Sequence, residues 1–207
     1  MYSGSLRSLI VAAILTFVPV VAGAATPMEG PAQFIKTLAA DAIEVLRSKD
    51  ATLAERQIKF HALLKERFAV RTIGRFVLGR YWRRTTPEQR GEYFELFADW
   101  IAKTYAVRFG GYTDERFDVT GTRINPGDGD VFVGTRIAKP ESSVAYKANW
   151  RVRRINGNYK IIDVEVEGIS MAMTQRAEFN SVTRREGIDG LLNILRQRID
   201  EIDRDGY

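Results

Sequence analysis

The sequence contains no cysteine and only one histidine, His61, among its 207 residues. The missing cysteines exclude disulfide bonds, thiolate nucleophiles and cysteine-ligated metal sites. His61 follows Phe60 and has no acidic neighbour at metal-ligand spacing, so a surface or partly buried histidine is the favoured interpretation. The sequence also lacks a glycine-rich phosphate loop, a nucleophile elbow and a dinucleotide-binding fingerprint. These absences favour a protein that binds rather than one that catalyses, with no cofactor and no metal.

Long hydrophobic runs are missing as well, apart from one near the N-terminus. The run from Leu9 to Val21 is shorter than the roughly 20 residues that span a bilayer. Arg7 precedes it and Ala22-Gly23-Ala24 follows it, which is typical of a cleaved signal peptide. We therefore expect a signal peptide over residues 1–24, cleaved near Ala24/Ala25, and a single domain over residues 25–207. Export without disulfides favours the bacterial periplasm, and a retained membrane anchor is the alternative.

Basic residues only slightly outnumber acidic ones. The chain has 31 basic and 26 acidic residues, a formal net charge of +5. That excess fits weak attraction to anionic headgroups, although solubility alone explains it equally well. Nucleic acid is a poor partner for an exported chain of such modest charge.

The order of periodic segments predicts an α+β fold. Pro31 opens an amphipathic helix, and Thr52 with Glu55 forms a capping box before a second one. Thr86 and Gln89 form another box around Pro87, before a helix whose apolar stripe ends at Tyr105. From residue 116 to 166 the apolar period falls to two, which indicates an antiparallel sheet of about four strands with one apolar face. Helices follow on either side of Gly187.

The last hairpin allows a register to be deduced. A three-residue loop over residues 156–158 places Val152 opposite Ile162, Trp150 opposite Val164 and Ala148 opposite Val166. A two-residue loop would mix the apolar and polar faces. On the polar face, the three-residue loop pairs Arg151 with Asp163 and Lys147 with Glu167, and we expect these pairs to face solvent without a catalytic role.

Two clusters of charged residues each have a functional and a structural interpretation. Asp163, Glu165 and Glu167 contain carboxylates that general acid–base catalysis requires, but the register favours ordinary cross-strand pairs. Arg80, Arg83 and Arg84 surround an aromatic pair and either hold a phosphate headgroup or form a solvated turn.

Several motifs resemble the MlaC (toluene-tolerance) family of periplasmic lipid carriers. Together they bracket the chain from about Phe60 to Ile199. The matching motifs are Leu78-Gly79-Arg80-Tyr81-Trp82, Thr86-Pro87-Glu88-Gln89-Arg90, Thr104-Tyr105-Ala106, Asp163-Val164, Glu167-Gly168-Ile169-Ser170 and Gly187-Ile188-Asp189-Gly190-Leu191-Leu192. The chain departs from the family at Phe109-Gly110-Gly111, where a helical leucine is usual.

The resemblance implies an NTF2-like curved sheet with added helices, and acyl chains held in an apolar cavity between them. It also implies a shuttle that carries phospholipid between the outer and inner membranes and maintains outer-membrane lipid asymmetry. The implied partners are an inner-membrane ABC transporter with an MCE-domain protein and an outer-membrane lipoprotein–porin complex. Arg80, Arg83 and Arg84 become headgroup candidates. The lipid-binding candidates are Phe76, Leu78, Tyr81, Trp82, Phe97, Ile101, Tyr105, Val133, Tyr146, Trp150, Val164, Val166, Ile169, Met171 and Met173.

Three alternatives stay open. Relatives associated with hopanoid biosynthesis suggest a rigid polycyclic cargo, an NTF2-like enzyme would need a carboxylate or histidine facing the cavity, and a scaffold of the cell envelope would bind no lipid. Within the carrier hypothesis, Ile169 is an apolar residue in an otherwise polar turn. We therefore expect Ile169 to line the cavity mouth.

Overall fold

The computed structural model describes residues 30–47, 51–109, 116–138 and 145–205. The expected signal peptide and the Gly110-Gly111 pair lie outside these residues. The elements follow in the order α1 (Pro31–Arg47), α2 (Leu53–Arg67), α3 (Val70–Leu78), the 3₁₀ helix η1 (Gly79–Arg84), α4 (Pro87–Phe109), β1 (Arg116–Ile124), β2 (Val131–Ala138), β3 (Ala145–Ile155), β4 (Asn158–Val166), β5 (Ile169–Ser170) and α5 (Met171–Asp205). This order confirms the predicted α+β fold class. No helix in the described part of the chain is both long and apolar enough to cross a membrane.

The helices begin where the capping residues predict. The Thr52 hydroxyl accepts a hydrogen bond from the Glu55 amide at 3.2 Å, and Glu55 accepts one from the Thr52 amide at 2.8 Å. Thr86 and Gln89 make the same reciprocal pair at the start of α4, at 3.2 and 3.0 Å. Each box satisfies backbone donors that the first helical turn leaves without a partner.

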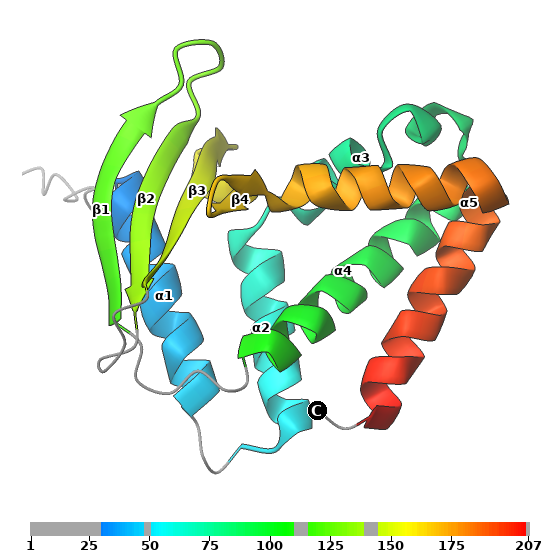
Figure 1. Ribbon diagram of the computed structural model, residues 1–207, viewed down its shortest axis with the longest axis horizontal. Coiled ribbons are helices and arrows are strands. Elements are labelled where there is room, and N and C mark those ends of the chain that lie inside the picture. The colour runs from blue at the N-terminus through cyan, green and yellow to red at the C-terminus, as the bar shows by residue number, and fades with distance from the viewer. Residues whose placement is uncertain (1–29, 48–50, 110–115, 139–144, 206–207) are drawn as a thin grey trace, which may run out of the picture.

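The strands form an antiparallel meander in the order β1-β2-β3-β4-β5, and the sheet does not close into a barrel. In Figure 1 the sheet stands on one side of the molecule, and α2, α4 and α5 occupy the other. The helix α1 packs against the sheet through Phe34, Ile35 and Leu38, which are buried with Val133 and Val152.

The β3–β4 hairpin confirms half of the deduced register and corrects its loop. Trp150 lies opposite Val164 and Ala148 opposite Val166, as expected. The loop, however, has two residues, Asn156 and Gly157, both with positive φ, and Ile155 pairs with Asn158. Asn-Gly adopts this mirror-image turn readily. A β-bulge between Arg151 and Val152 takes up the one-residue difference, so that Val152 lies opposite Ile161 instead of Ile162.

Neither expected ion pair across this hairpin forms among the described side chains. Lys147 and Glu167 do lie side by side and exposed, as expected, but the Glu167 carboxylate accepts a hydrogen bond from the Lys147 backbone amide at 2.6 Å. Arg151 lies opposite Asp163 in the sheet, but its guanidinium contacts Asp128 and the buried Asp130 at 2.5 and 2.7 Å. Arg153 also contacts Asp130, at 2.7 Å, which raises the pKa of Arg153. The turn before β2 therefore offers carboxylates that outcompete the neighbouring strand.

The C-terminal segment bends sharply at Gly187, whose φ of 74° and ψ of −176° are not helical. Figure 1 shows the first half of α5 leading away from the sheet and the second half turning back beside α4. The expected stop of one helix at Gly187 is thus confirmed. The second half contributes Leu191, Leu195 and Ile199 to an aromatic core around Tyr93, Phe97 and Phe179.

Candidate functional site

An apolar cavity of about 250 Å³ lies between the two hydrophobic cores of the described chain. The sheet core contributes Ile35 and Leu38 to its wall, and the helical core contributes Val77 and Phe97. Because neither core fills the space where sheet and helices meet, the cavity follows from the architecture itself. Its volume is close to the lower end of the range of roughly 300–1,000 Å³ that is usual for small-molecule pockets.

The wall comes from almost every element of the fold, and most of its side chains are aliphatic or aromatic. Asp163 and Gln175 are the only charged or amide side chains among the described residues that line it. An apolar group that enters such a space loses contact with water and gains roughly 25 cal/mol for each Å² buried. The cavity therefore suits a hydrocarbon ligand.

Asp163 faces this cavity instead of solvent, which corrects the expected outward position. Its Oδ1 accepts hydrogen bonds from the amides of Val164 and Ala172 at 2.8 and 3.0 Å, and its Oδ2 accepts one from the Ser170 hydroxyl at 2.5 Å. The Ser170 and Ala172 donors belong to the junction between β4 and α5. Both carboxylate oxygens are thus engaged in holding the start of α5, which leaves little capacity for general acid–base work.

The Trp150 ring is held in the sheet wall by a short chain of hydrogen bonds. Its Nε1 donates to the Thr135 hydroxyl at 2.9 Å, and that buried hydroxyl donates to the Ala148 carbonyl at 3.2 Å. Phe117 packs beside the ring, with 6.3 Å between centroids. The indole thereby presents its apolar surface to the cavity while its polar atom is satisfied elsewhere.

The structure brings seven of the expected lipid-binding residues together around the cavity: Phe97, Ile101, Tyr105, Trp150, Val164, Val166 and Met171. The other eight lie elsewhere. Leu78, Tyr81 and Val133 are buried inside the two cores, and Trp82 packs on the outside of the helical one. Four are exposed: Phe76, Tyr146, Ile169 and Met173.

Ile169 is 60% exposed and is not among the residues that line the cavity. Ile169 belongs to the short strand β5 and pairs with Val166 of β4. The turn between these two strands has positive φ at Glu167 and Gly168. This turn rotates the chain out of the phase of β4. The expected position of Ile169 at the cavity mouth is therefore wrong, and Met171 reaches the wall instead.

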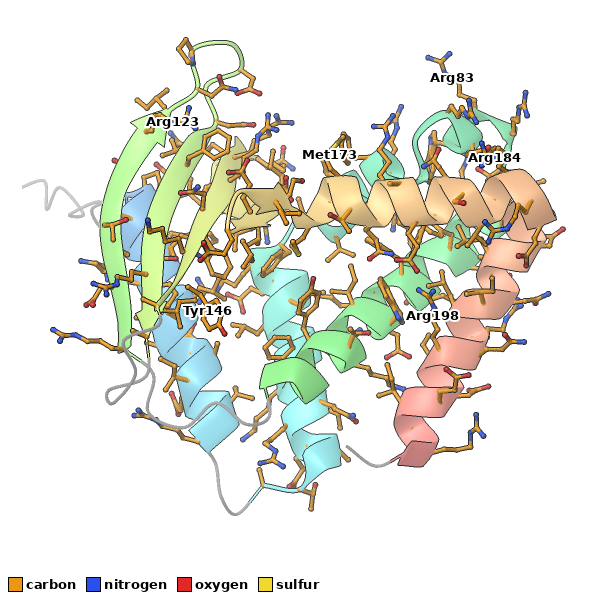
Figure 2. The ribbon with its side chains drawn as sticks, in the orientation of Figure 1. Arg83, Arg123, Tyr146, Met173, Arg184 and Arg198 are labelled. Atoms are coloured by element: carbon orange, nitrogen blue, oxygen red, sulfur yellow. The ribbon has the colours of Figure 1, made fainter. Side chains whose placement is uncertain are left out.

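The arginines Arg80, Arg83 and Arg84 lie in η1 and do not line the cavity. Figure 2 shows Arg83 at the end of the molecule opposite the sheet. Arg80 folds back on its neighbour, with Nη2 3.1 Å from the Tyr81 hydroxyl. The positions of these arginines do not support contact with the headgroup of a lipid in the cavity, so this contact stays a prediction.

The sequence reasoning missed much of the wall that the first three helices and the outer strands provide. The apolar stripes of these elements were visible, but a stripe alone does not distinguish a cavity wall from a filled core. The missed residues that line the cavity are Ile35, Leu38, Ala39, Ala42, Ile43, Phe60, Leu63, Leu64, Phe68, Val70, Ile73, Val77, Trp100, Phe117, Ile137, Asp163, Ala172 and Gln175. No group of three or more His, Asp or Glu side chains in the described ranges is placed to hold a metal ion.

Comparison with known families identifies the relatives of this chain. The family model described as "MlaC protein" matches residues 36–197, more than three quarters of the sequence. The chain belongs to the MlaC family. This confirms the resemblance seen in the motifs, and the matched range contains nearly every residue that lines the cavity.

One named protein is similar to this chain in sequence, and one solved structure is similar to it in fold. An intermembrane phospholipid transport system binding protein MlaC from Haemophilus influenzae is 26% identical over 128 residues. That match covers 60% of this chain and 59% of the relative's length. A phospholipid-binding protein from Ralstonia solanacearum, solved in complex with a phospholipid, superimposes with a TM-score of 0.72 at 20% identity. It covers 83% of this chain and 98% of that one, so the fold is shared across nearly the whole solved protein.

Proposed function

We propose that this MlaC-family protein is a periplasmic carrier that holds the acyl chains of a phospholipid in the cavity between its sheet and helices. The observation that carries the proposal is the apolar wall of this cavity, in which Asp163 and Gln175 are the only charged or amide side chains of the described lining. The names of the two relatives, one a phospholipid transport protein and the other crystallised with a phospholipid, support the same cargo.

The physical requirement for such a carrier is severe. Each methylene exposed to water costs roughly 0.8 kcal/mol, so a two-chain lipid does not cross an aqueous compartment unaided. A cavity that replaces the bilayer interior removes most of that cost. No bond is made or broken, and the engagement of both Asp163 oxygens in the α5 junction is consistent with transport rather than catalysis.

As partners, we propose an inner-membrane ABC transporter with an MCE-domain protein and an outer-membrane lipoprotein–porin complex. The carrier would move phospholipid between the membranes and so maintain lipid asymmetry of the outer membrane. The support is membership of the MlaC family together with the name of the transport-system relative.

Lipid content measured on purified protein tests the proposal. Protein recovered from the periplasm is extracted with organic solvent and analysed by mass spectrometry, and about one phospholipid per chain is expected. Ala42→Phe adds a ring inside the cavity from α1 and should reduce the lipid content several-fold. Overpacking of this kind costs typically 1–3 kcal/mol, so the fold should survive.

A matched control is available two residues away. Ala40 is exposed on the same helix and does not line the cavity, so Ala40→Phe should keep the wild-type lipid content. A polycyclic lipid in the extract would favour the hopanoid alternative. A wild-type protein without any lipid, or equal lipid in both variants, would contradict the proposal.

A further inference from the structure

A second groove lies on the outer face of α3, where the helix meets η1 and the start of α4. It is open to solvent, has a volume of about 530 Å³, and is lined by Arg71, Thr72 and Arg75 of α3, Trp82 of η1, and Arg90 and Phe94 of α4. The opposite face of α3 contributes Val70, Ile73 and Val77 to the lipid cavity. One helix therefore separates the two sites, and a lipid in the cavity does not occupy the groove.

The charge around this groove is strongly one-sided. Residues 67–87 contain six arginines and no lysine, aspartate or glutamate, whereas the whole chain carries a net charge of only +5. In the described part of the protein, the ion pairs formed by aspartate and glutamate involve none of the groove arginines Arg71, Arg75 and Arg90. Among the described residues, no ion pair with a carboxylate therefore neutralises the positive charge of the groove.

The guanidinium groups are held in place by aromatic rings. Arg71 lies over Phe94 at 4.6 Å from the ring centroid, and Arg75 and Arg90 lie over Trp82 at 5.6 and 4.7 Å. Stacking occupies the face of a guanidinium and not its N–H edge, which matches a carboxylate in a two-pronged geometry. The aromatic floor thus orders the arginines before any ligand arrives.

Arg90 is fixed further by hydrogen bonds. Its Nε donates to the Thr85 hydroxyl at 3.0 Å and its Nη2 donates to the Trp82 carbonyl at 3.0 Å. Trp82 also packs on Phe94, with 5.3 Å between centroids. The floor of the groove is therefore a rigid unit, and binding to it carries a small ordering cost.

We propose that this arginine–aromatic groove is the docking surface for a protein partner that presents clustered carboxylates. Protein interfaces are enriched in arginine and aromatic residues and depleted in lysine, whereas membrane-binding basic segments use lysine and arginine alike. The complete absence of lysine from residues 67–87 and the concave shape of the groove favour a protein over a flat lipid surface. The inference rests on the groove alone and stands whether or not the cavity holds lipid.

Photo-crosslinking of the full chain in cells of its source organism tests the proposal. Thr72 is exposed within the groove, and Thr72→p-benzoylphenylalanine places a light-activated group there. The expected result is a protein adduct whose crosslinked peptide, identified by tandem mass spectrometry, contains several aspartate or glutamate residues. The same group at Ala40, which is exposed on α1 and outside the groove, should give no such adduct.

Charge reversal then shows whether the arginines carry the interaction. Arg71→Glu with Arg75→Glu should reduce the adduct roughly tenfold or more, because like charges would face each other. Arg71→Lys with Arg75→Lys should reduce it less, because the charge remains and only the planar fork is lost. Circular dichroism and lipid content should match the wild type in both variants, since neither arginine lines the cavity.

A lipid-surface role is examined with vesicles of phosphatidylethanolamine and phosphatidylglycerol at a 3:1 ratio. Wild type and the Arg71→Glu, Arg75→Glu variant should sediment equally with these vesicles. A selective loss of vesicle binding in the variant would overturn the proposal in favour of membrane docking. An adduct that survives charge reversal, or the absence of any protein adduct at residue 72, would also overturn it.

Discussion

The backbone amide of Ala172 donates a 3.0 Å hydrogen bond to Oδ1 of Asp163 and so joins the last long strand to the first turn of α5. Ser170 strengthens the junction, because its hydroxyl donates to Asp163 and accepts from the Met173 amide at 3.0 Å. A negative charge at a helix N-terminus also interacts favourably with the helix dipole. The residues that close this end of the apolar cavity are thus the same residues that begin the helix.

Removal of this junction should destabilise the protein measurably. Asp163→Ala leaves the Ala172 amide and the Ser170 hydroxyl without their acceptor, which should lower the free energy of unfolding by about 1–3 kcal/mol. Urea denaturation followed by circular dichroism measures the change. Glu165→Ala is the matched control, because the Glu165 side chain makes a longer bond of 3.4 Å to Asn149, and its loss should matter by less than about 0.5 kcal/mol. Equal losses in both variants would contradict a capping role for Asp163.

The Gly187-Ile188-Asp189-Gly190 motif should tolerate no side chain at its second glycine. An added Cβ at Gly190 would lie 2.4 Å from the Cβ of Glu186, closer than real atoms approach. Gly190→Ala should therefore destabilise the bend of α5 by about 1–3 kcal/mol. Gly91→Ala on α4 offers the opposite case, because nothing lies within 4 Å and alanine favours a helix by about 0.5–1 kcal/mol. A thermal melt in which Gly190→Ala has a higher Tm than Gly91→Ala would refute the steric account.

The sequence alone predicts the elements of this fold well and its side-chain partners poorly. Capping boxes and Gly187 act over a few residues, so local chemistry is enough to place the helix ends. The β3–β4 register was deducible from the alternation of apolar and polar residues, but the bulge beside Val152 was not. A two-residue loop with a bulge gives the same pairing of Trp150 with Val164 as a three-residue loop without one. The Arg151 guanidinium contacts Asp130 instead of Asp163, and Asp130 belongs to a turn that is distant in sequence. The cavity is similarly non-local, since it exists only where two separately packed cores fail to meet.

The single histidine should make stability depend on pH in a simple way. Partial burial of His61, aided by the nearby Lys65 charge, lowers its pKa below the ordinary value of 6.5, although Asp99 and Glu95 on α4 act in the opposite direction. As the pH falls through 6.5, the unfolded chain binds a proton that the folded chain does not yet accept. Stability should therefore decline from about pH 7 downward until the folded pKa is passed.

His61→Gln isolates this effect from the carboxylates that titrate at lower pH. The difference in urea midpoint between wild type and His61→Gln should be constant above pH 7 and should shift against the wild type as the pH falls below about 6.5. A difference that stays constant below that pH, or one that shifts in favour of the wild type, would show that burial does not lower the pKa of His61.

Two neighbouring positions after β4 should respond differently to the same charge. Met171 lines the cavity, whereas Ile169 is 60% exposed outside it. Met171→Glu places a carboxylate against the acyl chains, where an unpaired charge costs several kcal/mol, so the purified protein should lose most of its lipid. The fold should survive, because a glutamate in the first turn of α5 is compatible with the helix dipole. Ile169→Glu should keep wild-type lipid, since its carboxylate stays in water. Lipid phosphorus per mole of purified protein measures both, and loss of lipid from Ile169→Glu with retention in Met171→Glu would place the cargo outside this cavity.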